Sequence, residues 1–149
     1  MTEITEVAVI PASVERVWEV ISATNRYAEW VAVCLEVTEH HGTATVGRSY
    51  SERNVVLGPL TTRSTWTVLE VVPMSRRVDA GTGFALVQDL TSAFLLRPVP
   101  EGTEMSYLVT YRFRLGRIGE VVDRVQQGGQ RHAMRQSMAN LAELLRSEA

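Results

Sequence analysis

The side chains of this sequence that could do chemistry are scattered along it, and no catalytic motif groups them. Three acidic residues fall within predicted strands, where a buried carboxylate would be a candidate acid–base group: Glu52, Glu70 and Asp89. Four more side chains could anchor a polar ligand group: Arg53, Gln88, Arg112 and His132. Arginine holds a carboxylate or an enolate bidentately, and histidine can serve as a general base. All seven residues belong to types that also occur on solvated surfaces.

Composition excludes several kinds of chemistry. All 15 basic residues are arginine, and without lysine the chain has no Schiff base, phosphate-loop lysine or Ser–Lys pair. Cys34 is the only cysteine, which excludes an internal disulfide and a thiolate metal cluster. His40 and His41 are adjacent on a predicted turn without further ligands, so we expect no metal. No nucleophile elbow, phosphate loop or dinucleotide fingerprint occurs, so we expect no cofactor either.

Length and charge bound the kind of protein. The 149 residues, 45% of them hydrophobic and 21% charged, predict a single soluble domain over residues 1–149. The net charge of -2 argues against nucleic acid as the main partner. No apolar run approaches the roughly 18 residues of a membrane span, and the first residues do not resemble a signal peptide. We therefore expect a cytoplasmic monomer or homodimer without stable membrane anchoring.

Hydrophobic periodicity predicts the elements that must position these side chains. Residues 3–10 alternate as a first strand, and Ser13 is typical of the N-cap of an amphipathic helix of about eleven residues. A second short helix from Thr24 places Tyr27 and Trp30 on one face.

Six β-rich runs follow the two helices. These runs are 32–39, 48–57, 61–72, 76–80, 84–98 and 103–115. The turn signals between them are His40-His41-Gly42, Leu57-Gly58-Pro59, Val72-Pro73, Gly81-Thr82-Gly83 and Pro100-Glu101-Gly102. Short connections favour antiparallel hairpins, so with the first strand we expect an antiparallel sheet of seven strands.

The C-terminal segment predicts one long helix with an anomaly at Gly128-Gly129. Apolar residues form one stripe before the glycine pair and another after it: Ile118, Val121, Val122 and Val125, then Met134, Met138, Leu141, Leu144 and Leu145. At about 100° per residue the two stripes differ in direction by roughly 160°, so one straight helix cannot bury both on the same side. Either the glycines bend or break the helix, or its halves pack against different partners, or the segment is a helix–turn–helix.

Residues in almost every element match a known pattern. They are Ile10-Pro11-Ala12-Ser13 with Glu15, Val17 and Trp18; Tyr27 and Trp30; Gly47 and Tyr50; Trp66-Thr67-Val68 with Glu70 and Pro73; Gly102-Thr103, Tyr111 and Phe113; and Gly116 through Ser137 with Asn140-Leu141. In this order they resemble the START-like (SRPBCC) superfamily, in particular the polyketide cyclase/dehydrase and lipid-transport family. The resemblance implies an α+β helix-grip fold. In that fold a curved seven-stranded antiparallel sheet wraps around a long C-terminal helix, with two short helices between strands 1 and 2.

The resemblance also implies an apolar cavity between the sheet and the helix. Seven aromatic side chains are expected to line it: Trp30, Tyr50, Trp66, Phe84, Phe94, Tyr111 and Phe113. Arg53, Gln88 and His132 would supply polar contacts. Val125 and Gly129 would cover the cavity from the helix, where the glycine pair could act as a gate. Sequence does not settle strand register, so the face that each strand residue occupies stays open.

Three kinds of function remain open. The first is non-enzymatic binding of a small hydrophobic or aromatic molecule, lipid- or polyketide-like, by a carrier, sensor or sequestering protein. The second is a polyketide aromatase/cyclase or dehydratase, which would position its substrate in a dry cavity beside one or two polar groups. The third is a protein-interaction module, such as a partner of a toxin or chaperone. A filled interior and an exposed apolar patch would favour the third.

Overall fold

The computed structural model describes residues 1–57 and 59–149, and in these residues seven strands and three helices follow one another in the predicted order. The strands are β1 (Thr2–Ile10), β2 (Cys34–Glu39), β3 (Ser49–Leu57), β4 (Leu60–Val72), β5 (Arg76–Thr82), β6 (Val87–Val99) and β7 (Gly102–Phe113). The helices are α1 (Val14–Ile21), the 3-10 helix η1 (Thr24–Glu29) and α2 (Gly116–Ser147). Gly58 of the predicted turn at Leu57-Gly58-Pro59 lies outside the described residues.

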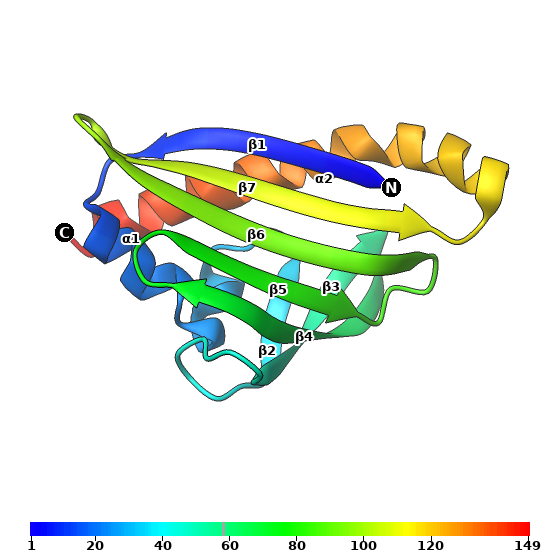
Figure 1. Cartoon of the computed structure of the whole chain (residues 1–149), viewed down its shortest axis with the longest axis horizontal. Coiled ribbons are helices and arrows are strands. Elements are labelled where there is room, and N and C mark those ends of the chain that lie inside the picture. Colours follow the sequence, from blue (N-terminus) through cyan, green and yellow to red (C-terminus); the bar gives the residue numbers. More distant parts are fainter. Residues whose placement is uncertain (58) are drawn as a thin grey trace.

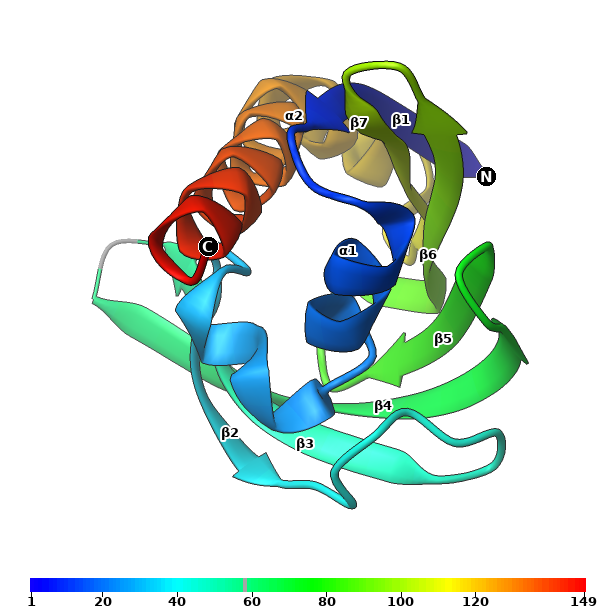
Figure 2. The same ribbon diagram turned by 90° about the vertical axis from the view of Figure 1, so that its left-hand side faces the viewer.

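The strands form one antiparallel sheet in the order β1-β7-β6-β5-β4-β3-β2. The sheet curves around the helices: Figure 2 shows α1 within the concave side and α2 running along it. In Figure 1 the long helix α2 crosses the length of the sheet, beside β1. The predicted helix-grip fold, with two short helices between β1 and β2, is therefore confirmed.

The two short helices close one end of the concave face. Ser13 caps α1 as predicted, because its Oγ accepts a hydrogen bond from the backbone N–H of Arg16 at 3.3 Å. The helix is shorter than predicted, with 8 residues, and it ends at Ser22, whose hydroxyl donates to the Trp18 carbonyl at 2.7 Å. In η1, Tyr27 packs edge-on against Trp30 with ring centroids 5.5 Å apart, as the predicted shared face requires.

Strand alternation decides which side chains face the concave side. In β3, Tyr50, Glu52 and Asn54 point inward, while Arg53 points outward. The register pairs Tyr50 with Trp66 and Glu52 with Ser64, so the inward residues of β3 and β4 lie side by side.

Helix α2 runs unbroken through Gly128-Gly129, so the predicted break and the helix–turn–helix alternative are wrong. Its second half buries the later apolar stripe, of which Met134 and Met138 are each 1% exposed. The earlier stripe faces solvent instead, and Ile118 and Val125 are 70% and 80% exposed. The predicted divergence of the two stripes explains this result, because a continuous helix that buries one stripe must expose the other.

The first half of α2 packs through a different set of contacts. Gly119 lies against Phe113, where an added Cβ would come within 2.9 Å of the Phe113 Cβ. Asp123 is buried, and its carboxylate accepts hydrogen bonds from Thr2 Oγ1 at 2.6 Å and from the Tyr111 hydroxyl. The two halves of α2 thus differ in their contacts, as one of the alternatives expected, but the first half packs through Gly119 and Asp123 and not through its apolar stripe.

Candidate functional site

A cavity of about 580 Å³ lies between the concave face of the sheet and the first half of α2. Its walls come from β3, β4, β6 and β7, from η1, and from the loop between β5 and β6. Gln126 and Gln130 line it from α2. The walls are largely aromatic and aliphatic, as in most sites for small molecules.

Half of the residues predicted to bind a ligand line this cavity. They are Tyr50, Trp66, Phe84, Phe94, Tyr111 and Phe113. The rings form a connected set, since Tyr111 contacts Phe113 with centroids 5.5 Å apart and Phe94 contacts Tyr107 at 4.8 Å. Tyr107 and Tyr27 also line the cavity, although the sequence analysis did not place them there.

The structure places the other predicted ligand-binding residues away from the cavity. Trp30 is 1% exposed and packs behind Phe94 in the core, with ring centroids 5.4 Å apart. The remaining five are exposed on the outside of the protein: Arg53, Gln88, Val125, Gly129 and His132. The predicted polar anchor Arg112 is also largely exposed, 3.6 Å from Asp89. Register and helix phase explain most of these positions, because Arg53, Gln88, Val125 and Gly129 each adjoin a residue that lines the cavity.

The three candidate carboxylates differ clearly in their burial. Glu52 is 3% exposed and lines the cavity. The side chains of Glu70 and Asp89 are 41% and 61% exposed, and each lies near an arginine on the surface. Glu52 is therefore the candidate that fulfils the condition set by the sequence analysis, namely a buried carboxylate.

A chain of hydrogen bonds leads to Glu52 across β3 and β4. The Trp66 indole Nε1 donates to Ser64 Oγ at 3.1 Å, and Ser64 Oγ donates to Asn54 Oδ1 at 2.5 Å. Asn54 Nδ2 then donates to Glu52 Oε1 at 2.7 Å. Burial raises the pKa of Glu52, and the hydrogen bond from Asn54 opposes that effect.

Two cavity-lining residues keep a buried polar atom without a partner among the residues that the structure describes. These atoms are Glu52 Oε2 and the Tyr27 hydroxyl. Burial also raises the pKa of Tyr27 well above its ordinary value, so its hydroxyl stays protonated at neutral pH. The otherwise apolar cavity thus has a polar end that could contact a polar group of a ligand.

A buried ion pair, Arg77 with Asp79, lies next to this polar end of the cavity. Arg77 Nε donates to Asp79 Oδ1 at 3.1 Å, and the Tyr50 hydroxyl donates to Asp79 Oδ2 at 2.5 Å. The Arg77 guanidinium lies 5.0 Å from the ring centre of Tyr27 and 5.5 Å from that of Tyr50. The sequence analysis missed this pair. The signal in the sequence was that Arg77 and Asp79 are two positions apart within the predicted strand 76–80, which places both side chains on the same face.

Polar contacts also hold α2 over the cavity. Gln126 Nε2 donates to the Tyr111 hydroxyl at 2.6 Å, while Gln127 Nε2 donates to Asp123 at 3.0 Å within the helix and orients that carboxylate. Asp123 therefore joins α2 to both β1 and β7, through Thr2 and Tyr111. The sequence analysis did not identify Asp123, because an acidic residue in a helix is usually solvated.

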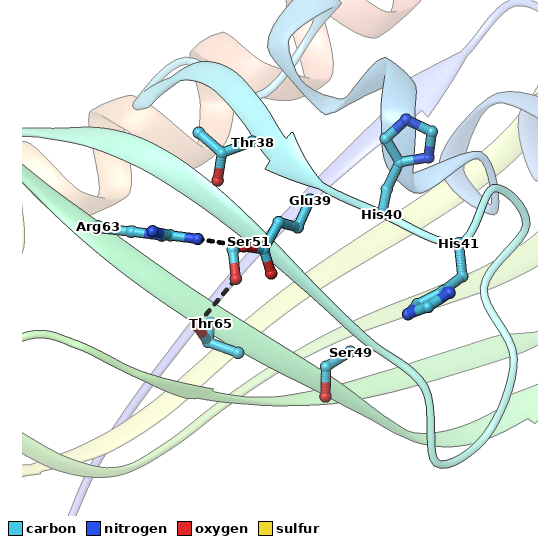
Figure 3. Close-up of a pocket in the computed structure, with 8 residues that line it drawn as sticks. All are labelled: Thr38, Glu39, His40, His41, Ser49, Ser51, Arg63 and Thr65. Atoms are coloured by element: carbon cyan, nitrogen blue, oxygen red, sulfur yellow. Dashed lines mark hydrogen bonds and ion pairs between the residues drawn. The ribbon is translucent and has the colours of Figure 1, made fainter.

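A second hollow, of about 640 Å³, lies on the outer face of β3 and β4 and is shown in Figure 3. Its polar groups already contact one another: Ser51 Oγ lies 3.0 Å from Thr65 Oγ1, and Arg63 donates to Glu39 at 2.6 Å. His40 and His41 lie at its edge. Across residues 1–57 and 59–149, no three His, Cys, Asp or Glu side chains gather as a metal site would require. We therefore take the inner cavity as the candidate site.

Comparisons with known proteins agree with the fold. A family model described as polyketide cyclase / dehydrase and lipid transport matches residues 1–146. No curated protein matches the chain. Among the described helices, none is long and apolar enough to cross a membrane.

Several solved structures are similar over most of this chain. Protein CV1439 from Chromobacterium violaceum is 21% identical with a TM-score of 0.77, and the match covers 97% of each chain. Protein Ms6760 from Mycobacterium smegmatis is 19% identical with a TM-score of 0.75, covering 99% of this chain and 92% of that one. DynU16, a protein of the dynemicin biosynthetic locus, is 18% identical with a TM-score of 0.71, covering 98% of this chain and 48% of that one. At such identities these structures show the fold alone.

Proposed function

Because the chain belongs to the polyketide cyclase / dehydrase and lipid transport family, we propose that its inner cavity binds a small hydrophobic or aromatic molecule without chemical change. The observation that carries this proposal is the cavity itself, of about 580 Å³ and lined mainly by aromatic and aliphatic side chains. Its volume lies within the range of roughly 300–1,000 Å³ that is usual for small-molecule sites. On this proposal residues 1–149 act as one ligand-binding domain, and the protein is a carrier, sensor or sequestering protein.

The proposed ligand contacts follow from the walls of the cavity. We retain the six predicted aromatics that line it and add Tyr27, Tyr107, Glu52 and Gln126. The aromatic faces would bury the apolar body of the ligand, which is the main source of affinity in such sites. Leu60 and Leu86, which are 61% and 43% exposed, also line the cavity and offer apolar surface to an entering ligand.

Native mass spectrometry of the purified protein tests the proposal, followed by ¹H–¹⁵N titration with lipids, flavonoids and polyketide aromatics. We expect a co-purifying or saturable ligand, with shifts on the inward residues of β3, β4, β6 and β7. A matched pair of variants localises binding: Val87→Trp adds bulk to the cavity wall, whereas Val9→Trp adds it at a position 49% exposed on β1. Val87→Trp should weaken binding and Val9→Trp should not. A clean apo mass and no shifts would contradict the proposal and favour a protein-interaction module.

Glu52 favours one second candidate, a cyclase or dehydratase that acts in the same cavity. Enolisation and loss of water need a group that can take or give a proton, and Glu52 is the buried carboxyl group that lines the cavity. The pKa of Glu52 is raised, as is common for carboxylic acids that serve as proton donors. For an enzyme, a polyketide substrate added to the protein would be converted to a cyclised isomer of the same mass or to a product lighter by one water, and Glu52→Gln would stop the conversion. An unaltered ligand would favour the carrier.

A further inference from the structure

The hydrogen bonds that link Trp66 to Glu52 all have their donors on the Trp66 side. Trp66 donates to Ser64, Ser64 donates to Asn54, and Asn54 donates to Glu52. Glu52 Oε1 accepts the last of these hydrogen bonds, while Glu52 Oε2 has no partner in the described part of the chain. Three side chains therefore fix the orientation of one carboxyl group, whose second oxygen remains unpaired.

An unpaired buried oxygen is unusual in a folded protein, because burial removes the water that would otherwise bind it. The neighbour on β2 is Cys34, which lies opposite Asn54 and whose thiol approaches the Glu52 carboxyl group as a weak donor. Cys34 is itself buried, and burial raises the pKa of its thiol, so it remains uncharged. Glu52 Oε2 therefore lacks a strong hydrogen-bond partner among the described residues, and a bound molecule could supply one.

We propose that Glu52 Oε2 binds a hydroxyl group of the ligand, which makes the ligand a phenol, an enol or an alcohol with an apolar body. A hydroxyl group both donates and accepts, so it can pair with Oε2 whether the carboxyl group is ionised or protonated. An ammonium group pairs well only with the ionised form, which burial disfavours here. The Tyr27 hydroxyl, the other unpaired group on the cavity wall, offers the ligand a further polar contact. This inference rests on the proposed function, since it requires a ligand in the cavity.

Two probes that differ by one methyl group test the proposal. The protein is titrated with 2-naphthol and with 2-methoxynaphthalene, which keeps the ring but lacks the hydroxyl donor. Binding is followed by the ¹H–¹⁵N signals of the Trp66 indole and the Asn54 side-chain amide, which lie in the chain that ends at Glu52. We expect 2-naphthol to bind about tenfold more tightly, the effect of one good hydrogen bond to a carboxyl group.

Variants assign this preference to Glu52. Glu52→Leu should bind both probes with similar affinity, whereas the control Glu70→Gln, at an exposed strand position, should keep the tenfold preference. If Glu52→Leu does not fold, the wild-type protein still gives an answer through the ¹³C shift of the Glu52 carboxyl group. That shift should move with 2-naphthol and not with 2-methoxynaphthalene.

The outcomes separate this proposal from the proposed function. Equal affinities of the wild-type protein for the two probes, with shifts on the cavity residues, would overturn the hydroxyl site and leave the cavity function standing. A preference that survives in Glu52→Leu would also overturn it. If neither probe binds, the hydroxyl site is overturned, while the cavity function is judged separately by the native mass and by the titration with lipids, flavonoids and polyketide aromatics.

Discussion

Arg77 and Asp79 form an ion pair within the core, and their side chains are only 0% and 3% exposed. Both residues face the concave side of β5, and the Tyr50 hydroxyl adds a further hydrogen bond to Asp79. The pair packs against the aromatic wall of the cavity, because the Arg77 guanidinium lies over the rings of Tyr27 and Tyr50. The same two residues therefore stabilise the core and position the Tyr27 and Tyr50 side chains of the cavity wall.

Replacing Asp79 should strongly destabilise the protein. Asp79→Ala leaves the Arg77 charge buried without its partner, which costs about 3–5 kcal/mol in the free energy of unfolding. Urea denaturation measures the change. The control is Glu70→Ala, which removes a surface ion pair with Arg76 and should cost about 0–1 kcal/mol. Similar losses of unfolding free energy in the two variants would show that the buried pair contributes no more to stability than a surface pair.

The raised pKa of Glu52 predicts a pH dependence of stability. Because the folded state binds this proton more tightly than the unfolded state, Glu52 contributes most below its ordinary pKa of 4.5. That contribution is lost as the pH rises through the folded pKa. Glu52→Gln does not titrate, so it should gain stability relative to the wild-type protein as the pH rises above 4.5.

Urea denaturation of the wild-type protein and Glu52→Gln at a series of pH values measures this difference. The titratable groups that affect Glu52 or are affected by it are Cys34, Asp79, Tyr27 and Tyr107. The ¹³C shift of the Glu52 carboxyl group against pH reports its own titration and separates it from theirs. A stability difference that is constant with pH, or that grows toward acid, would contradict the prediction.

Trp66 should report ligand binding by its fluorescence. Its side chain lines the cavity, whereas Trp30 lies in the core behind Phe94. Adding a lipid that does not absorb near-ultraviolet light should change the emission, and Trp66→Phe should lose most of that change. The control Trp18→Phe should keep it, because Trp18 does not line the cavity. If binding persists while the wild-type emission stays constant, Trp66 does not contact the ligand.

The glycine pair in α2 should tolerate alanine. Beyond its chain neighbours and the adjacent helix backbone, an added Cβ at Gly128 or Gly129 would meet no described atom within 4 Å. Glycine costs about 1 kcal/mol relative to alanine inside a helix, so the double variant should be more stable by about 2 kcal/mol. Thermal or urea denaturation measures this gain. The same variant tests the gate hypothesis: slower ligand association and dissociation would support it, and unchanged rates would contradict it.

The two stripes of α2 should differ in their effect on stability. Val125→Gln changes a side chain that is 80% exposed and should alter the free energy of unfolding by no more than about 0.5 kcal/mol. Met138→Ala removes a side chain that is 1% exposed and should cost about 2–5 kcal/mol. If Val125→Gln instead caused a large loss that depended on protein concentration, a second copy of the chain would cover this stripe.

The sequence determined the order of elements, because alternation, capping residues and turn residues are local signals. It placed α1, η1 and all seven strands close to their observed bounds, and the order of these elements indicated the helix-grip fold. It also predicted that the two stripes of the C-terminal helix could not be buried together. Each of these inferences depends on residues within a few positions of one another.

Only the tertiary structure decided which side chains share the cavity. Arg53 and Glu52 are adjacent, yet Arg53 lies outside and Glu52 inside, because a shift of one residue in a strand reverses every side chain. The same limit applies to the helix, where Gln126 and Gln130 line the cavity but Val125 and Gly129 do not. Glu52 became the candidate group because the register of β3 and β4 brings Asn54, Ser64 and Trp66 to one side of it. That register depends on pairings between strands, which no local pattern of residues contains.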